Sequence, residues 1–164
     1  MPLDIPDDLQ KAAAAKSIND YLNHYVTVID TKAGAFLAGN VAAAPMLLHG
    51  WPGDWVGRTT SVLSISLFAA STLVASGVIF PRLPARGSSV IFWGDIACEH
   101  DSTGYIRRFN DVIERGQLDE HYALQNYHTA RVLRRKFRWL RCCIVLFFAA
   151  LVFGFFTYLW APAG

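Results

Sequence analysis

The sequence predicts an all-α membrane protein with three transmembrane helices, of which the first and the last extend into the cytosol and form a helical bundle. Residues 33–53, 59–81 and 142–164 contain no Asp, Glu, Lys or Arg. Each stretch is long enough to cross a hydrocarbon core of about 30 Å. Hydrophobic residues make up 53% of the 164-residue chain, while the charged residues are confined to separate blocks. This composition favours a membrane protein.

We treat the chain as one membrane unit with five consecutive segments. Residues 7–32 form a cytosolic helix, 33–53 the first span, 59–81 the second span, 82–138 a cytosolic cap and stalk, and 139–161 the third span. "Stalk" here means the cytosolic extension of a spanning helix. From Gln117 to Trp160 no Gly or Pro occurs before Gly154. A single helix of this length would measure about 66 Å, so that a large part of it stands outside the bilayer.

Apolar residues at steps of three or four predict a stripe on each long helix. The first stripe comprises Ile18, Leu22, Tyr25, Ile29, Ala33 and Phe36, and the last Ala123, Tyr127, Ala130, Leu133, Phe137, Leu140 and Ile144. We expect the two stalks to pack together, within one chain or between chains. Residues 102–116 have the pattern of an amphipathic helix that ends at Gly116. The apolar residues of the cap should bury against the stalks: Ile91, Phe92, Trp93, Ile106, Phe109, Val112 and Ile113.

The basic residues predict that the N-terminus is cytoplasmic and the C-terminus is periplasmic, because Lys and Arg favour the cytoplasmic side. Most of them flank the predicted spans on one side, and the opposite loop carries only Arg58. Acidic residues and the lack of an early apolar core argue against a cleaved signal peptide. Small residues from Gly34 to Ala44 give the first span a surface suited to close helix contact, and we expect a homo-oligomer.

Two polar groups lie where the first helix is expected to enter the lipid, Asp30 and Lys32. In one interpretation Lys32 reaches the lipid headgroups and Asp30 faces water. In the other, both form the floor of a cytosolic ligand site under the last stalk. Asn40 lies about two turns deeper, and we expect it to point inward, toward a neighbouring helix or a water path.

The sequence contains no constellation that would support catalysis or metal binding. It has no GxSxG, HExxH or phosphate-binding glycine loop. Its five histidines and three cysteines lack the spacing of a metal set or a disulfide framework. The serines of the second span fit helix packing better than an intramembrane serine hydrolase. We therefore expect no enzyme activity, no metal and no cofactor.

Several motifs, in order, carry a resemblance to a known family. They are DTKAG at 30–34 with Asn40 following, IFWGDIA at 91–97, Tyr105, and LQNYHTARVLRRKFRWLR at 124–141. This set resembles the small transmembrane effectors (PycTM) of bacterial Pycsar antiphage systems, over nearly the whole chain. The resemblance implies an inner-membrane protein that is paired with a pyrimidine cyclase. It also implies a response to cyclic CMP or cyclic UMP that impairs the membrane and causes abortive infection.

A cyclic mononucleotide needs a cation or amide donors for its phosphate and stacking or edge contacts for its base. We expect this ligand, and no nucleic acid polymer, to be bound by Asp30, Lys32, Tyr105, Arg107, Tyr122, Gln125, Asn126 and Arg131. Alternatively, the arginines are solvated surface and Tyr122 belongs to the core. For the whole protein, the main alternative is a small structural or adaptor membrane protein without ligand gating.

Overall fold

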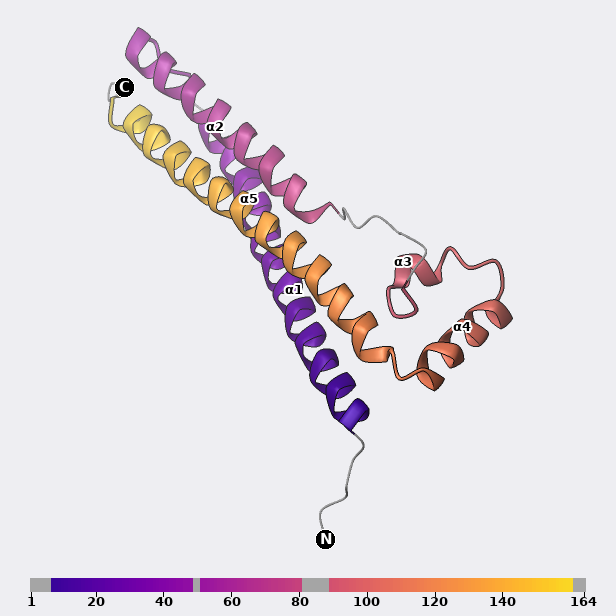
Figure 1. Cartoon of the computed structure of the whole chain (residues 1–164). Coiled ribbons are helices and arrows are strands. Elements are labelled where there is room, and N and C mark those ends of the chain that lie inside the picture. The colour runs from indigo at the N-terminus through magenta and orange to yellow at the C-terminus, as the bar shows by residue number, and fades with distance from the viewer. Residues whose placement is uncertain (1–6, 49–50, 81–88, 161–164) are drawn as a thin grey trace. The chain divides into compact units, whose positions relative to one another are not determined.

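The structure is a computed structural model that describes residues 7–48, 51–80 and 89–160 (Figure 1). The described residues form five helices and no strand. The helices are α1 (Asp7–Leu48), α2 (Trp55–Ile79), α3 (Trp93–Ile96), α4 (Ser102–Glu114) and α5 (Leu118–Trp160). The predicted all-α class is therefore confirmed. The expected amphipathic helix corresponds to α4, and the segment around Trp93 forms one short helical turn.

Carboxylates begin two of these helices by accepting hydrogen bonds from free backbone N–H groups. The side chain of Asp54 accepts from the backbone N–H of Gly57 over 2.9 Å at the start of α2. The side chain of Asp101 accepts from the backbone N–H of Gly104 over 2.5 Å at the start of α4. Such caps satisfy donors that the helix itself leaves unpaired.

Helix α4 ends where the sequence predicts, at a glycine in the left-handed region. Gly116 has a φ of 64°. Its N–H donates to the carbonyl of Ile113, and the N–H of Gln117 donates to the carbonyl of Val112, both over 3.0 Å. These two bonds form a Schellman motif, which favours glycine because a side chain is strained at positive φ. The chain then turns directly into α5.

The chain folds into two compact units, and both long helices contribute to each of them. Unit 1 consists of Met1–Val26 and Arg82–Arg134, and unit 2 of Thr27–Pro81 and Arg135–Gly164. Unit 1 thus takes the first part of α1, the first part of α5, and the whole of α3 and α4. Unit 2 takes the remainder of α1 and α5 together with α2.

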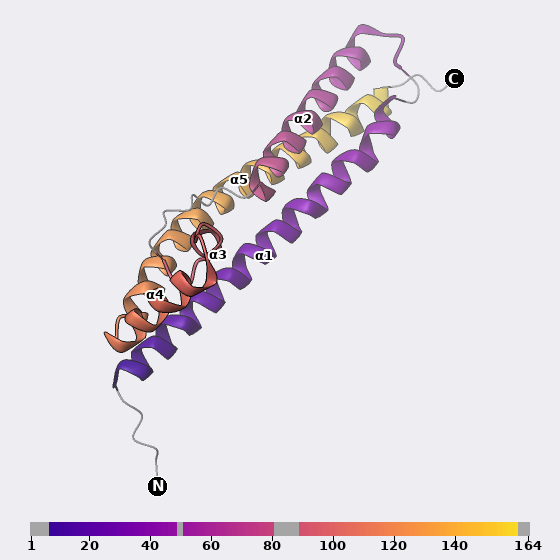
Figure 2. The ribbon, with the colours of Figure 1, turned by 90° about the vertical axis from the view of Figure 1, so that its right-hand side faces the viewer.

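In unit 1, α1 and α5 lie side by side and are joined by polar side chains (Figure 2). Phe92 is buried next to α3. Helix α4, however, has no buried residue, and Trp93 is 66% exposed. Ile106 and Ile113 of α4 are exposed as well. The expectation that these three cap residues are buried is therefore wrong, because unit 1 fills its interior largely from α1, α5 and the segment 89–95.

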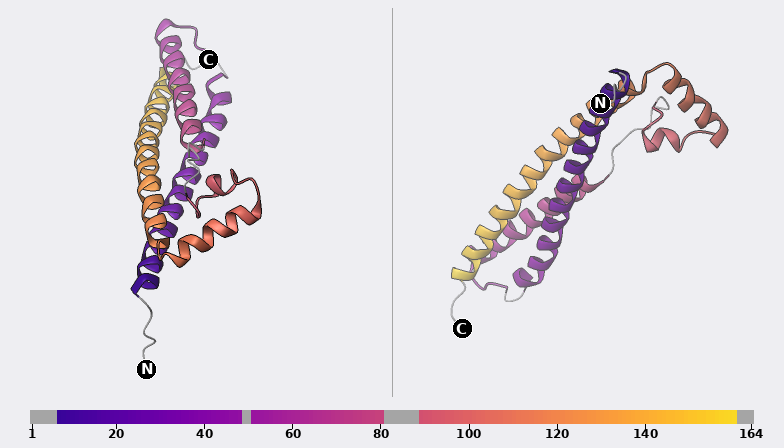
Figure 3. Two further views of the ribbon diagram at one scale, coloured as in Figure 1. Left: turned by 45° about the vertical axis from the view of Figure 1, so that its right-hand side comes forward. Right: turned by 90° about the horizontal axis from the view of Figure 1, so that it is seen from below.

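In unit 2, α1, α2 and α5 run alongside one another (Figure 3). The ring of Phe147 on α5 contacts Phe36 of α1 and Phe68 of α2, with ring centroids 5.2 and 5.8 Å apart. Gly39 of α1 faces the same ring, since a Cβ built there would lie 3.3 Å from it. These aromatic contacts join all three helices at one level.

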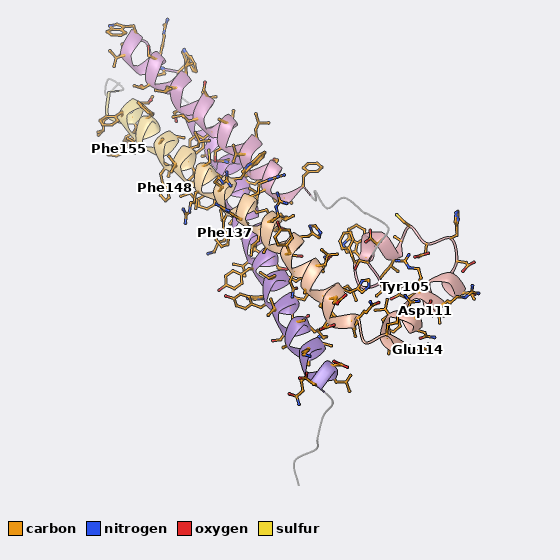
Figure 4. All side chains as sticks on the ribbon, in the orientation of Figure 1. Tyr105, Asp111, Glu114, Phe137, Phe148 and Phe155 are labelled. Carbon is orange, nitrogen blue, oxygen red and sulfur yellow. The ribbon has the colours of Figure 1, made fainter. Side chains whose placement is uncertain are left out.

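Two helices are long and apolar enough to cross a membrane in the described part of the chain. They are Trp55–Ile79 and Leu118–Leu159, whose most apolar windows of 18 residues have a mean hydropathy of 2.0 and 2.5. Phe148 and Phe155 extend outward from α5, as lipid-facing side chains would (Figure 4). These two helices correspond to the second and third predicted spans. The first predicted span, 33–53, does not meet the same measure in α1 and extends past the described residues, so the count of three stays a prediction.

The apolar stripe expected on α5 is wrong for most of its length. Ala123, Tyr127, Ala130 and Phe137 are exposed. Leu140 is buried as expected, but the other buried residues of α5 lie outside the predicted stripe: Asn126, Thr129, Cys143 and Ala150. On α1 the expected residues Ile29 and Ala33 are buried, whereas Ile18 is exposed. The prediction assumed that the largest apolar side chains of the helix are buried. The residues that are buried are mostly smaller or more polar.

Candidate functional site

An ion pair joins α1 to α5 within unit 2. The ammonium of Lys136 lies 2.6 Å from Oδ1 of Asp30. The Lys136 side chain is only 11% exposed and that of Asp30 is 32% exposed. Lys32, which one interpretation of the sequence groups with Asp30 in the floor of a ligand site, has an exposed side chain. Asp30 is thus held by a cation from the last helix, which leaves Lys32 on the surface.

A chain of amide hydrogen bonds joins α1 to α5 within unit 1. Asn23 donates to Asn19, and Asn19 donates to Oδ1 of Asn126, each over 2.9 Å. The Nδ2 group of Asn126 in turn donates to the backbone carbonyl of Ala15 over 2.8 Å. Asn126 is only 8% exposed. This predicted ligand residue therefore holds the two helices together with both ends of its amide.

The other predicted ligand residues of unit 1 lie on α4 and α5. Arg107 and Arg131 are exposed, whereas Tyr122 and Gln125 are half-buried. Tyr105 is half-buried, and its hydroxyl donates to the backbone carbonyl of Val90 over 3.0 Å. Six of the eight predicted residues thus belong to unit 1, and Asp30 and Lys32 belong to unit 2.

Several charges of unit 1 are held by neighbouring groups. The guanidinium of Arg108 pairs with the carboxylate of Glu99. The guanidinium carbon of Arg131 lies 5.8 Å from the ring centroid of Tyr127, within the range of a cation–π contact. The ammonium of Lys16 donates a hydrogen bond to the carboxylate of Asp20, which raises the pKa of Lys16. Arg131 and Tyr127 together present a cation and an exposed aromatic face, which are the two groups that an anionic ligand with a base requires.

Sequence reasoning missed Asn19 and Lys136. Lys136 lies within a run of arginines that precedes the predicted third span, and it follows Thr129 and precedes Cys143 by seven residues each. A spacing of seven places residues on one face of a helix that packs against neighbours. On α1 the same spacing of seven separates the buried residues Ala12 and Asn19, and also Ala33 and Asn40, but small and polar side chains make this pattern less visible. Small and polar residues at a spacing of seven are therefore the sequence signal that could have identified the buried faces of α1 and α5.

The geometry defines a class of protein: a small helical membrane protein whose long helices are joined by polar contacts. The described residues contain no group of three or more His, Cys, Asp or Glu that could hold a metal ion. The family model for the Pycsar effector protein domain (PycTM) matches residues 14–162, and the chain belongs to this family. No curated protein and no solved structure matches the chain. Membership in this family implies that the protein acts as an effector in antiphage defence.

Proposed function

We propose that the protein is an effector of the bacterial inner membrane that binds cyclic CMP or cyclic UMP and then impairs membrane integrity, which leads to abortive infection. The observation that carries this proposal is the family match, because it extends over 14–162 and so includes parts of both units. A functionally paired pyrimidine cyclase would supply the nucleotide.

The membrane part of the proposal is supported by the surface of unit 2. Helices α2 and α5 carry large apolar side chains on their outer faces, among them Leu73, Val145 and Phe155. A soluble protein would rarely expose so many at once, whereas a bilayer solvates them. We propose three spans with a cytoplasmic N-terminus and a periplasmic C-terminus. The first of these spans would be the second half of α1, which belongs to unit 2 together with α2.

The ligand part is supported by the chemistry of unit 1. Arg107, Arg131 and Gln125 can donate to a phosphate or to the edges of a pyrimidine, and Tyr122 can stack on the base. Lys32 belongs to unit 2 and also carries an exposed ammonium. A ligand acts only if it binds one conformation better than another. Because α1 and α5 run through both units, a change in their packing in unit 1 would be carried along continuous helices.

We further propose that the active form is a homo-oligomer. Ala35, Ala38 and Ala42 are exposed on one side of α1, and a Cβ at Gly34 would meet no atom within 4 Å. Small exposed residues permit close helix contact between chains in a bilayer. Gly39 is a poorer probe of such contact than expected from the sequence, since it already faces Phe147 of the same chain.

The test is membrane depolarisation in cells that express the protein, measured with a voltage-sensitive dye while the nucleotide dose is varied. Cyclic CMP or cyclic UMP should depolarise the cells in a dose-dependent way, and cyclic AMP serves as the matched nucleotide control. Binding to the purified protein by calorimetry should show the same preference. A structural or adaptor protein would insert without any nucleotide-dependent depolarisation, and that outcome would refute the proposal.

A further inference from the structure

The interior of unit 2 contains a row of polar side chains among its apolar ones. Seven α2 residues are buried at alternating steps of four and three: Gly57, Ser61, Ser64, Phe68, Ser71, Ala75 and Val78. Three of them are serines, and Asn40 of α1 is buried with them. We call Asn40, Ser61, Ser64 and Ser71 the polar face. Polar side chains inside a membrane protein mark either helix contacts or a path for water and ions.

The polar face is connected to α5 at successive levels. Asn40 donates to the hydroxyl of Ser71 over 3.1 Å, and that hydroxyl lies 3.2 Å from the backbone carbonyl of Cys143. Ser64 donates to the backbone carbonyl of Ala150 over 2.7 Å. One heptad further along α5, the hydroxyl of Thr157 donates to that of Thr60 over 2.9 Å.

These three levels follow the long axis of the helices. Successive contacts on α5 are seven residues apart, from Cys143 through Ala150 to Thr157. Each step corresponds to a rise of about 10.5 Å along a helix. The polar groups therefore extend over about 21 Å, which is most of a hydrocarbon core of about 30 Å.

Two oxygen atoms of the polar face have no hydrogen-bond partner. They are Oδ1 of Asn40 and the hydroxyl oxygen of Ser61, on residues that are 2% and 1% exposed. A buried polar atom without a partner is costly, so native proteins retain few of them. Helix packing alone does not require the hydroxyl of Ser61, since the smaller Ala would permit the same close helix contact without leaving a polar atom unpaired. The two unpartnered oxygens point instead to a ligand that is bound through oxygen.

The two unpartnered oxygens are uncharged, and each can accept a hydrogen bond from water or coordinate a monovalent cation. An amide oxygen does not bind an anion. Hard cations prefer carbonyl, amide and hydroxyl oxygens as ligands. No buried residue of the polar face carries a charge that would trap a cation, and conduction requires weak binding at several positions. The ring of Phe147 contacts Phe36 and Phe68 and faces Gly39, and its position in α5 lies between Cys143 and Ala150. Such an apolar constriction can close a path by excluding water.

We propose that the polar face lines a path for water and monovalent cations through unit 2, which the aromatic contacts of Phe147 keep closed until the effector is activated. This inference rests on the proposed function, since it names the route by which the membrane becomes permeable. It predicts a selective leak of small cations rather than a general rupture of the bilayer.

The test uses the full-length protein in liposomes, with potassium flux, chloride flux and dye release followed after cyclic CMP or cyclic UMP is added. Ser61→Ala removes an unpartnered hydroxyl and should lower the nucleotide-dependent potassium flux at least threefold without lowering the melting temperature. Asn40→Leu should lower it at least tenfold. Ser66→Ala is the matched control, because Ser66 is exposed and donates to the carbonyl of Val62 on its own helix. Phe147→Ala should raise the flux that is measured without nucleotide.

The outcomes separate this inference from the proposed function. If the parent protein shows no nucleotide-dependent flux, the proposed function fails and the path fails with it. If the parent conducts and both Ser61→Ala and Asn40→Leu conduct equally well, only the path is refuted, and the polar face serves helix packing. Chloride flux equal to potassium flux, or release of a large dye, would also refute a narrow cation path while leaving membrane impairment intact.

Discussion

Lys136 on the last helix forms an ion pair with Asp30 on the first, over a distance of 2.6 Å. The two residues are 106 positions apart in the sequence. Their pairing holds α1 and α5 together within unit 2 and leaves Lys32 free to meet solvent, lipid headgroups or ligand.

The first prediction concerns this ion pair. Lys136→Ala should lower the free energy of unfolding by about 1–3 kcal/mol, less than for a fully buried pair because Asp30 is partly exposed. Asp30→Ala should have a similar effect. The double variant should lose less than the sum of the two, and thermal unfolding in mild detergent measures all three. Strictly additive losses would mean that the two charges do not interact.

The second prediction separates a structural from a ligand-binding role for neighbouring residues of α5. Asn126→Ala leaves the buried Nδ2 group of Asn19 without its acceptor and removes the hydrogen bond to the carbonyl of Ala15, and it should cost about 1–3 kcal/mol of stability even without ligand. Gln125→Ala should leave the stability within about 0.5 kcal/mol of the parent and weaken nucleotide binding instead. Calorimetric binding and thermal unfolding of both variants provide the comparison. Equal binding by Gln125→Ala and the parent would remove Gln125 from the site.

The third prediction concerns Lys32. Lys32→Ala should abolish nucleotide-dependent depolarisation while the protein remains in the membrane. The ammonium of Lys32 is exposed, so that we expect it to bind the phosphate of the nucleotide and to contribute little to folding. Arg141→Ala is a suitable comparison, because that residue should affect orientation in the membrane rather than binding. Depolarisation against nucleotide dose should be measured for both, together with the amount of inserted protein. If Lys32→Ala responds like the parent, Lys32 only contacts lipid headgroups.

The fourth prediction concerns two glycines in different surroundings. A Cβ at Gly77 of α2 would overlap with the indole ring of Trp139 of α5. Gly77→Ala should therefore lower stability by about 1–3 kcal/mol through overpacking. A Cβ at Gly34 would meet nothing, so Gly34→Ala is the matched control and should not destabilise the monomer. The melting temperatures of the two variants in detergent test this prediction. Equal melting temperatures for Gly77→Ala and Gly34→Ala would contradict the packing of α2 on α5.

The fifth prediction concerns topology. Single cysteines at Asp20 and at Gln125, in a protein without its three native cysteines, should react with a membrane-impermeant thiol reagent only after the inner membrane is opened. A cysteine at Trp55, which is exposed at the start of α2, should react from the periplasmic side in intact spheroplasts. Reaction at position 20 or 125 from the periplasmic side would refute the three-span arrangement with a cytoplasmic N-terminus.

The ends of helix α4 can be predicted from the sequence because interactions between residues close in the chain determine them. Asp101 caps α4 through an atom three residues away, and Gly116 ends it through its own backbone conformation. The continuous helix after Gln117 was likewise expected, because no residue before Gly154 interrupts it. The family resemblance was also readable from motifs in order, and the family match confirmed it.

By itself the sequence determined the helical class, two of the bilayer-length helices and the family. The tertiary structure decided which faces of those helices meet. Periodicity could not identify the inner face of α5. In the apolar half of the helix, residues 142–160, every face is apolar. In unit 1 the buried positions of α5 hold polar residues, Asn126 and Thr129. The partner of Asn126 is 107 residues away and that of Lys136 is 106 residues away. No local pattern specifies such pairs, since they form only when packing brings two distant helices within hydrogen-bond distance.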